Sequence, residues 1–172
     1  MQDLPPVCVI DANVLFDAEA GGFLQDLFCL DCVFLTTDIV VHNEIKSIPH
    51  ADLLALGLRI QGLSGDQILE MVEIRRKYLA LSIPDISVML LARRMGAPLL
   101  SGDGPLRKIA GEEGVVLHGT LWVLDRLVAG EILTRARAAR AIEAMQQNGR
   151  WLPGVECRRR MQEWGQEKAP SK

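Results

Sequence analysis

The sequence has few aromatic residues and no long apolar run, and these shortages argue against several classes of protein. Aromatic residues make up 5% of its 172 positions. No segment approaches the ~18 consecutive apolar residues that a membrane-spanning helix needs, so we expect no membrane association. The first residues lack a basic segment followed by an apolar one, so we expect no secretion signal. The resulting prediction is a cytoplasmic protein.

Cysteine is also scarce. The 4 cysteines are Cys8, Cys29, Cys32 and Cys157, too few for a disulfide framework in a chain of this length. Cys29 and Cys32 have the C-x-x-C spacing, but a zinc site of this type needs a second pair, which the sequence lacks. A redox or metal role for this pair is therefore the less favoured interpretation.

Negative charge dominates only the first part of the chain, and the formal net charge is -3 overall. Residues 1–74 hold 12 acidic residues and only Lys46 and Arg59 as bases, whereas residues 75–129 and 130–172 each carry more bases than acids. This arrangement suits a protein that gathers carboxylates around a metal and places arginines for phosphate groups. Solvated helix faces would give the same asymmetry, so both interpretations stay open.

The hydrophobic pattern predicts an α/β protein built on a parallel sheet. Short apolar runs predict strands at residues 7–10, 33–36, 98–101 and 115–117, and a further strand is favoured at residues 54–60. Periodicity and capping signals predict helices from about residue 14 and over residues 19–28, 39–45, 64–81, 85–95, 105–112, 121–128, 134–147 and 155–166. This alternation favours a three-layer α/β/α fold with a central parallel sheet of about five strands.

The chain is expected to form one domain with a helical extension. Residues 1–129 would form the α/β domain, residues 130–166 would pack on it as helices, and residues 167–172 would form a flexible tail. A hydrophobic content of 49% is enough for a real core. The predicted helix over residues 134–147 carries an apolar stripe that would cover either this domain or a second copy, namely Ala136, Ala139, Ile142 and Met145.

Four acidic residues are predicted to gather at one edge of the sheet. They are Asp11 and Asp103, which directly follow strands, Asp85, in the first turn of an apolar helix, and Glu44, in the helix after the second strand. The carboxyl ends of parallel strands form the ligand-binding edge of open α/β sheets, so these side chains are candidates for one site. Buried like charges repel unless a cation joins them, and Mg²⁺ or Mn²⁺ prefers carboxylate oxygens.

Each acid also has a purely structural interpretation. Asp11, Asp85 and Asp103 stand at predicted helix N-termini, where Asp is a favoured cap and the helix dipole stabilises negative charge. Glu44 would then be an exposed helix charge, the commonest environment for Glu. The coincidence of four acids at one edge favours a metal site over these separate explanations.

These acids lie in motifs that resemble those of PIN-domain proteins, the fold of metal-dependent ribonucleases that include the VapC-type toxins of toxin–antitoxin pairs. The motifs occur in the family's order at residues 9–15, 37–45, 84–92 and 100–103, and the resemblance covers residues 7–129. Gly119, Thr120 and Leu121, followed by a helical extension, resemble a PIN subgroup predicted to bind nucleic acid.

The resemblance implies a metal-dependent ribonuclease. By position, Asp11, Glu44, Asp85 and Asp103 would be the catalytic and metal-binding residues, with Asn13 and Ser101 in support of their carboxylates or of a metal-bound water. A bound Mg²⁺ or Mn²⁺ would activate water for hydrolysis of an RNA phosphodiester, leaving a 5′-phosphate and a 3′-hydroxyl. The implied partners are RNA, a small antitoxin protein and a second copy of the chain.

Basic residues near the site are few. Arg107 and Lys108, one turn after Asp103, are the favoured contacts for RNA phosphates, and the other basic clusters are ascribed to solvated helix faces. The glycines on both sides of Asp103 predict a more flexible turn at this carboxylate than in the family pattern. Three tryptophans lie in the C-terminal part, where we favour packing over base stacking: Trp122, Trp151 and Trp164.

Two alternatives remain beside the ribonuclease. One is a PIN-like module that binds nucleic acid or protein without catalysis. The other is a phosphatase of the haloacid-dehalogenase type, which also begins with a strand followed by Asp. That family needs a second Asp two residues later, where this chain has Asn13, so the phosphatase is the least favoured.

Overall fold

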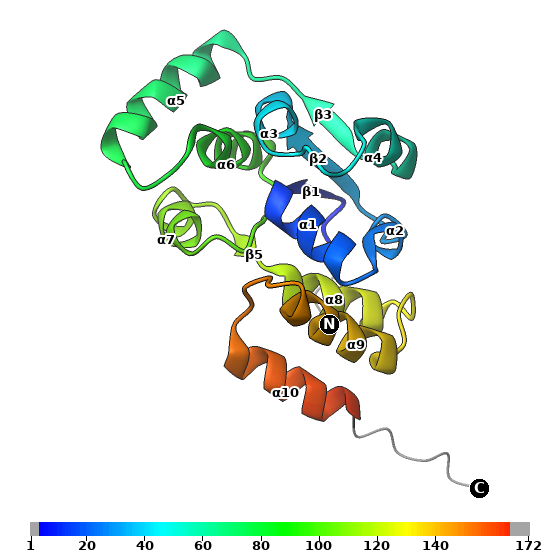
Figure 1. Ribbon diagram of the computed structural model, residues 1–172. Helices are drawn as coiled ribbons and strands as arrows, with labels where there is room; N and C mark the ends of the chain where they lie inside the picture. Colours follow the sequence, from blue (N-terminus) through cyan, green and yellow to red (C-terminus); the bar gives the residue numbers. More distant parts are fainter. Residues whose placement is uncertain (1–3, 166–172) are drawn as a thin grey trace, which may run out of the picture.

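A five-stranded parallel sheet lies at the centre of the computed structural model, which describes residues 4–165. The strand order is β3-β2-β1-β4-β5 (Figure 1). The strands are β1 (Val7–Ile10), β2 (Val33–Thr37), β3 (Arg59–Gln61), β4 (Leu99–Leu100) and β5 (Leu117–His118). The chain moves outward from β1 to β3 and then returns to the other side of β1, so the sheet has a switch point between β1 and β4.

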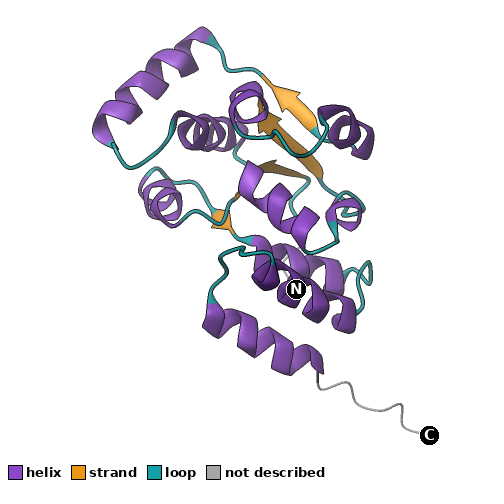
Figure 2. Cartoon of the chain, viewed as in Figure 1, coloured by secondary structure: helices purple, strands orange, loops and turns teal. Residues whose placement is uncertain are grey.

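Helices cover both faces of the sheet, as Figure 2 shows by the purple helices around the orange strands. They are α1 (Ala12–Ala20), α2 (Leu24–Leu27), α3 (Asp38–Asn43), α4 (His50–Leu56), α5 (Gly65–Lys77), α6 (Ile83–Met95), α7 (Gly104–Glu112), α8 (Thr120–Ala129), α9 (Arg135–Gln147) and α10 (Gly154–Gly165). Helix α6 packs on β2, β1 and β4, while α1 packs with α2 and α8. Because parallel crossovers are right-handed, the reversal at the switch point puts α1 and α6 on opposite faces.

The core follows from the apolar runs of the sequence. The β1 residues Cys8, Val9 and Ile10 are fully buried, as expected for a central strand covered on both faces. Helix α6 is buried from Ile86 to Ala92 and begins with a capping box between Ser82 and Asp85. The predicted three-layer α/β fold with a parallel sheet of five strands is therefore confirmed.

Two predicted elements were wrong, and glycine explains both. Residues 54–56 belong to α4, which ends where Gly57 takes a φ of +111°, and β3 begins only at Arg59. The single helix predicted over residues 19–28 is split, because α1 continues to Ala20 and Gly22 then turns the chain with a φ of +70°. Such backbone angles favour glycine, and periodicity alone does not reveal where they occur.

Other elements begin or end a few residues away from the predicted positions. The last strand is at Leu117–His118 instead of 115–117, and α5 ends at Lys77 instead of near Leu81. Helix α3 ends at Asn43, so Glu44 occupies its C-cap position and not its interior. The predicted tail over residues 167–172 lies outside the described residues.

The C-terminal helices extend the molecule beyond α8. Helix α9 packs against α1 and α8, and α10 packs against α9, so that α10 lies far from α5 (Figure 1). The buried stripe of α9 consists of Ala138, Ala141, Ile142 and Met145. The predicted Ile142 and Met145 are therefore buried within the chain, whereas Ala136 is exposed. Within residues 4–165, no helix has both the length and the hydropathy needed to cross a membrane.

Candidate functional site

Asp11 and Ser101 lie side by side at the switch point of the sheet. Strands β1 and β4 pair Val9 with Leu99 and Ile10 with Leu100, so Asp11 and Ser101 are the next residues along each strand. The Asp11 backbone N–H donates to the Leu100 carbonyl over 3.0 Å, which continues the ladder by one bond. The Ser101 hydroxyl then donates to Asp11 Oδ2 over 2.8 Å, and Asp11 Oδ1 accepts from the Ala12 N–H over 2.7 Å.

Asn13 and Ser101 hold the turn that carries Asp103. The Ser101 hydroxyl accepts from the Asp103 N–H and from Asn13 Nδ2, each over 3.1 Å. Asn13 Oδ1 accepts from the Gly102 N–H over 3.0 Å. The Asn13 and Ser101 side chains thereby fix the turn around Asp103, although its two glycines would allow it to be flexible. The structure thus joins Asp11, Asn13, Ser101 and Asp103 in one hydrogen-bonded group.

Asp85 and Asp103 also cap helices. Asp85 Oδ2 accepts from the Ser82 N–H over 2.7 Å at the start of α6, and Asp103 Oδ1 accepts from the Leu106 N–H over 2.7 Å at the start of α7. Both side chains are half-buried, as is Glu44 at the end of α3. The predicted capping is therefore present at these two aspartates, and also at Asp11, which is the N-cap residue of α1. Because each cap uses one oxygen, it leaves the other oxygen of each carboxylate for another role.

The charges of the four carboxylates act on one another. Burial raises the pKa of Asp11 to about 7, the Ser101 hydrogen bond opposes this, and the charges of Glu44 and Asp85 add to it. Burial also raises the pKa of Glu44, and the charges of Asp85 and Asp103 raise it further. The four predicted acids therefore share one electrostatic neighbourhood, at the carboxyl edge where the sequence placed them.

The four carboxylates do not converge on one point. In residues 4–165, no three side chains of His, Cys, Asp or Glu lie close enough together to form a ready metal site. Asp85 and Asp103 are held by helix caps, and Asp11 is held by its cap of α1 at Ala12 and by Ser101. The donor chemistry fits a hard divalent cation, since carboxylate oxygens are its preferred ligands and its charge would offset their repulsion.

A family model described as a PIN domain matches residues 7–166. The chain belongs to the PIN-domain family. PIN domains are typically nucleases that use divalent metal ions and bind nucleic acid, and this membership removes the basis of the phosphatase alternative. The match spans all four carboxylates together with α9 and α10.

This PIN domain is also similar to solved structures. Among solved structures, it is similar to a PilT N-terminus domain protein from the hyperthermophilic archaeon Sulfolobus solfataricus P2, with 18% identity and a TM-score of 0.48. That alignment covers 69% of this chain and 91% of the other. No curated protein matches the chain.

A buried ion pair joins the C-terminal helices to the site of this PIN domain, and sequence reasoning missed it. Asp17 on α1 is 3% exposed, and it accepts hydrogen bonds from Thr120 and from Arg150 Nε, the latter over 2.6 Å. Arg150 also donates to the Asn13 carbonyl over 3.1 Å. The available signal was Asp17 itself, an acid one turn after Asn13 in an apolar helix. Its partner is 133 positions away.

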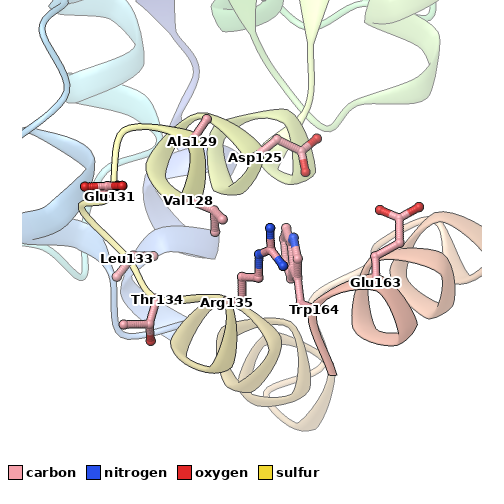
Figure 3. Close-up of a pocket in the computed structure, with 9 residues that line it drawn as sticks. All are labelled: Asp125, Val128, Ala129, Glu131, Leu133, Thr134, Arg135, Glu163 and Trp164. Carbon is pink, nitrogen blue, oxygen red and sulfur yellow. The ribbon is translucent and has the colours of Figure 1, made fainter. Parts of the chain in front are cut away.

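The two predicted RNA-binding residues differ in their surroundings. Both are exposed on α7. Arg107 donates to the Leu117 carbonyl over 3.2 Å and lines a pocket of about 450 Å³ that reaches Gly102 and Gly104. Lys108 does not line this pocket. A larger pocket of about 730 Å³ lies away from the four carboxylates of the candidate site. It lies between α8 and α10, and its wall includes Asp125, Glu163 and Trp164 (Figure 3).

Proposed function

We propose that this PIN domain is a metal-dependent ribonuclease that hydrolyses phosphodiester bonds of RNA. The observation that carries the proposal is the shared electrostatic neighbourhood of Asp11, Glu44, Asp85 and Asp103 at the switch point of the sheet. An arrangement that raises the pKa of a buried Asp to about 7 is unfavourable for the protein alone. A bound cation would turn the same arrangement into a favourable one.

The four carboxylates would hold Mg²⁺ or Mn²⁺, with Asn13 and Ser101 in support. When bound, the ion lowers the pKa of a coordinated water and offsets charge on the scissile phosphate. The role of the chain is to position these groups. Ser101 orients the Asp11 carboxylate, and Asn13 fixes the Gly102 backbone and thereby the turn that presents Asp103. Arg107 adds positive charge next to that turn, where an RNA phosphate would lie.

Cleavage of a mixed RNA panel tests the proposal. Wild-type protein is incubated with Mg²⁺, Mn²⁺ or EDTA, and product ends are analysed for 5′-phosphate and 3′-hydroxyl groups. We expect cleavage that requires metal and is lost in Asp11→Asn. Asp66→Asn, an exposed Asp in the first turn of α5, is the matched control and should cleave like wild type.

A non-catalytic module is the second candidate, and the lack of convergence among the carboxylates favours it. Two measurements separate it from the nuclease. A nuclease should show both RNA cleavage and a rise in melting temperature with Mg²⁺ or Mn²⁺ that Asp11→Asn reduces. A binding module should show neither, while it still binds RNA in EDTA.

The resemblance to VapC-type toxins supports a finer proposal, in which the protein is the toxin of a toxin–antitoxin pair and acts as a homodimer. Induced expression should then arrest growth of the host cell, and Asp11→Asn should not. A small antitoxin encoded next to it should restore growth and co-purify with the wild-type protein. Light scattering on the purified protein would give the oligomeric state directly.

A further inference from the structure

A second recess adjoins the carboxylate edge. This pocket of about 450 Å³ lies between the turn around Asp103, the segment from β5 to α8, and the residues that connect α9 with α10. Gly102 and Gly104, the neighbours of Asp103, form part of its wall. A group bound there would therefore lie next to whatever the carboxylates bind. Its volume is typical of sites that take a small molecule or one unit of a polymer.

The wall of this pocket is largely aromatic and apolar. The His118 and Trp122 rings stack within it, with centroids 4.3 Å apart and planes 5° from parallel. Trp151 also lines the pocket and is 77% exposed, although a tryptophan gains more from burial than most side chains. Trp164, by contrast, is 8% exposed, so the packing role predicted for the tryptophans is fulfilled there and not at Trp151.

The charges around the pocket leave one cation unneutralised. Asp17 pairs with Arg150, and Arg160 pairs with Asp125 and Glu156. Arg107 is the remaining charged side chain in the wall, and within residues 4–165 it forms no ion pair with a carboxylate. Its hydrogen bond goes to a neutral carbonyl, at Leu117. The pocket therefore offers flat apolar surface together with a single free positive charge.

We infer that this pocket binds one unpaired nucleobase of the RNA, stacked on Trp151, while Arg107 contacts the adjacent phosphate. The inference rests on the proposed ribonuclease function and adds a specificity subsite to it. A nucleotide matches both parts of the pocket, because its base is flat and apolar on its faces and its phosphate is anionic. A segment of a partner protein would match the aromatic wall but has no general need for a cation beside a metal site.

Binding of mononucleotides in EDTA tests this inference without requiring cleavage. Ligand-observed NMR would compare the four ribonucleoside 5′-monophosphates with ribose 5-phosphate and inorganic phosphate. We expect at least one nucleotide to bind measurably more tightly than ribose 5-phosphate. Trp151→Leu should weaken its binding by about fivefold or more, and Trp151→Phe should retain most of it. Leu79→Ala, an equally exposed residue beyond the end of α5, is the control and should bind like wild type.

The outcomes separate this inference from the proposed nuclease. Base-dependent binding that needs an aromatic residue at position 151 supports the subsite, even if no RNA is cleaved. Equal binding of nucleotides and ribose 5-phosphate, or an unchanged affinity in Trp151→Leu, overturns the subsite, even if RNA is cleaved. Failure of all four nucleotides to bind also overturns it, and would turn attention to a protein segment as the occupant.

Discussion

The Ser101 hydroxyl donates a hydrogen bond to Asp11 Oδ2 over 2.8 Å, between residues 90 positions apart. The same hydroxyl accepts from the Asp103 N–H, so one fully buried oxygen touches two of the four carboxylate residues. Its position follows from the parallel pairing of β1 with β4. The sheet therefore sets the relative position of Asp11 and Asp103 before any ligand binds.

Ser101→Ala should damage both stability and activity. The substitution leaves a buried carboxylate oxygen and a backbone N–H without this partner, at a cost of about 1–3 kcal/mol. Because the Ser101 hydrogen bond lowers the pKa of Asp11, its loss should raise that pKa further. The rising limb of the pH–rate profile for RNA cleavage should then shift to higher pH.

Urea unfolding and pH–rate measurements on Ser101→Ala and Ser101→Thr check this prediction. Threonine keeps the hydroxyl, so Ser101→Thr should restore the wild-type profile. An alanine variant with an unshifted pH profile would show that the hydroxyl does not act through Asp11.

Stability of the metal-free protein should fall as the pH rises toward neutrality. Burial raises the pKa of Asp11 from its ordinary value of 3.8 to about 7. The folded state therefore binds a proton that the unfolded state releases, and this contribution is complete below pH 3.8 and lost as the pH rises through about 7. At about 1.4 kcal/mol per pKa unit, the loss is a few kcal/mol.

Urea unfolding in EDTA between pH 5 and pH 8 measures this effect. The comparison with Asp11→Asn isolates the contribution of this side chain, because the amide that replaces the carboxyl group does not ionise. We expect the variant to become more stable relative to wild type as the pH increases. Addition of Mg²⁺ should reverse the difference at pH 8, and a difference that does not depend on pH would contradict the prediction.

Those parts of the fold that depend on local chemistry were predictable. The buried strand β1 and the starts of α3 and α5 follow from neighbouring residues, since Thr37 caps α3 and Ser64 and Gln67 form a capping box at α5. Residues 54–60 were not predictable, because their apolar pattern fits a helix as well as a strand. Only the tertiary position of the chain decides between the two.

In the candidate site, too, some residues could be placed from the sequence and others depend on the tertiary structure. Asp11 and Asp103 could be placed at one edge from strand order alone, since parallel strands align their carboxyl ends. The cap at Asp85 was also predictable, because this residue stands in the first turn of an apolar helix, whereas the position of Glu44 at the C-cap of α3 depends on where that helix ends. The pairing of Asp17 with Arg150 depends on how α9 packs against α1, and no pattern within the sequence specifies that packing.

Arg150→Met should destabilise the protein more than the removal of a surface charge does. The substitution leaves Asp17 buried without its cation, and breaking a buried ion pair costs on the order of 3 kcal/mol. Solvent screening reduces this cost here, because Arg150 is partly exposed. RNA cleavage should fall as well, because Arg150 also donates to the Asn13 carbonyl.

Chemical unfolding of Arg150→Met beside Arg137→Ala provides the comparison. Arg137 pairs with Asp26 between α9 and α2 at a more exposed position, where loss of the pair should cost about 1 kcal/mol or less. Equal destabilisation by the two substitutions would show that the buried pair has no special role.

Arg107→Ala should weaken RNA binding more than Lys108→Ala, although the two residues are neighbours on one exposed helix. Arg107 faces the pocket beside Asp103, whereas Lys108 does not line it. A residue that neutralises one phosphate releases about one counterion, so its removal should reduce the salt dependence of binding by about one unit of slope. Fluorescence anisotropy with a labelled single-stranded RNA in EDTA, over a range of salt concentrations, measures this slope without cleavage. Lys108→Ala should keep the wild-type slope. A larger change in Lys108→Ala than in Arg107→Ala would place the RNA backbone on the other side of α7 and away from the carboxylates.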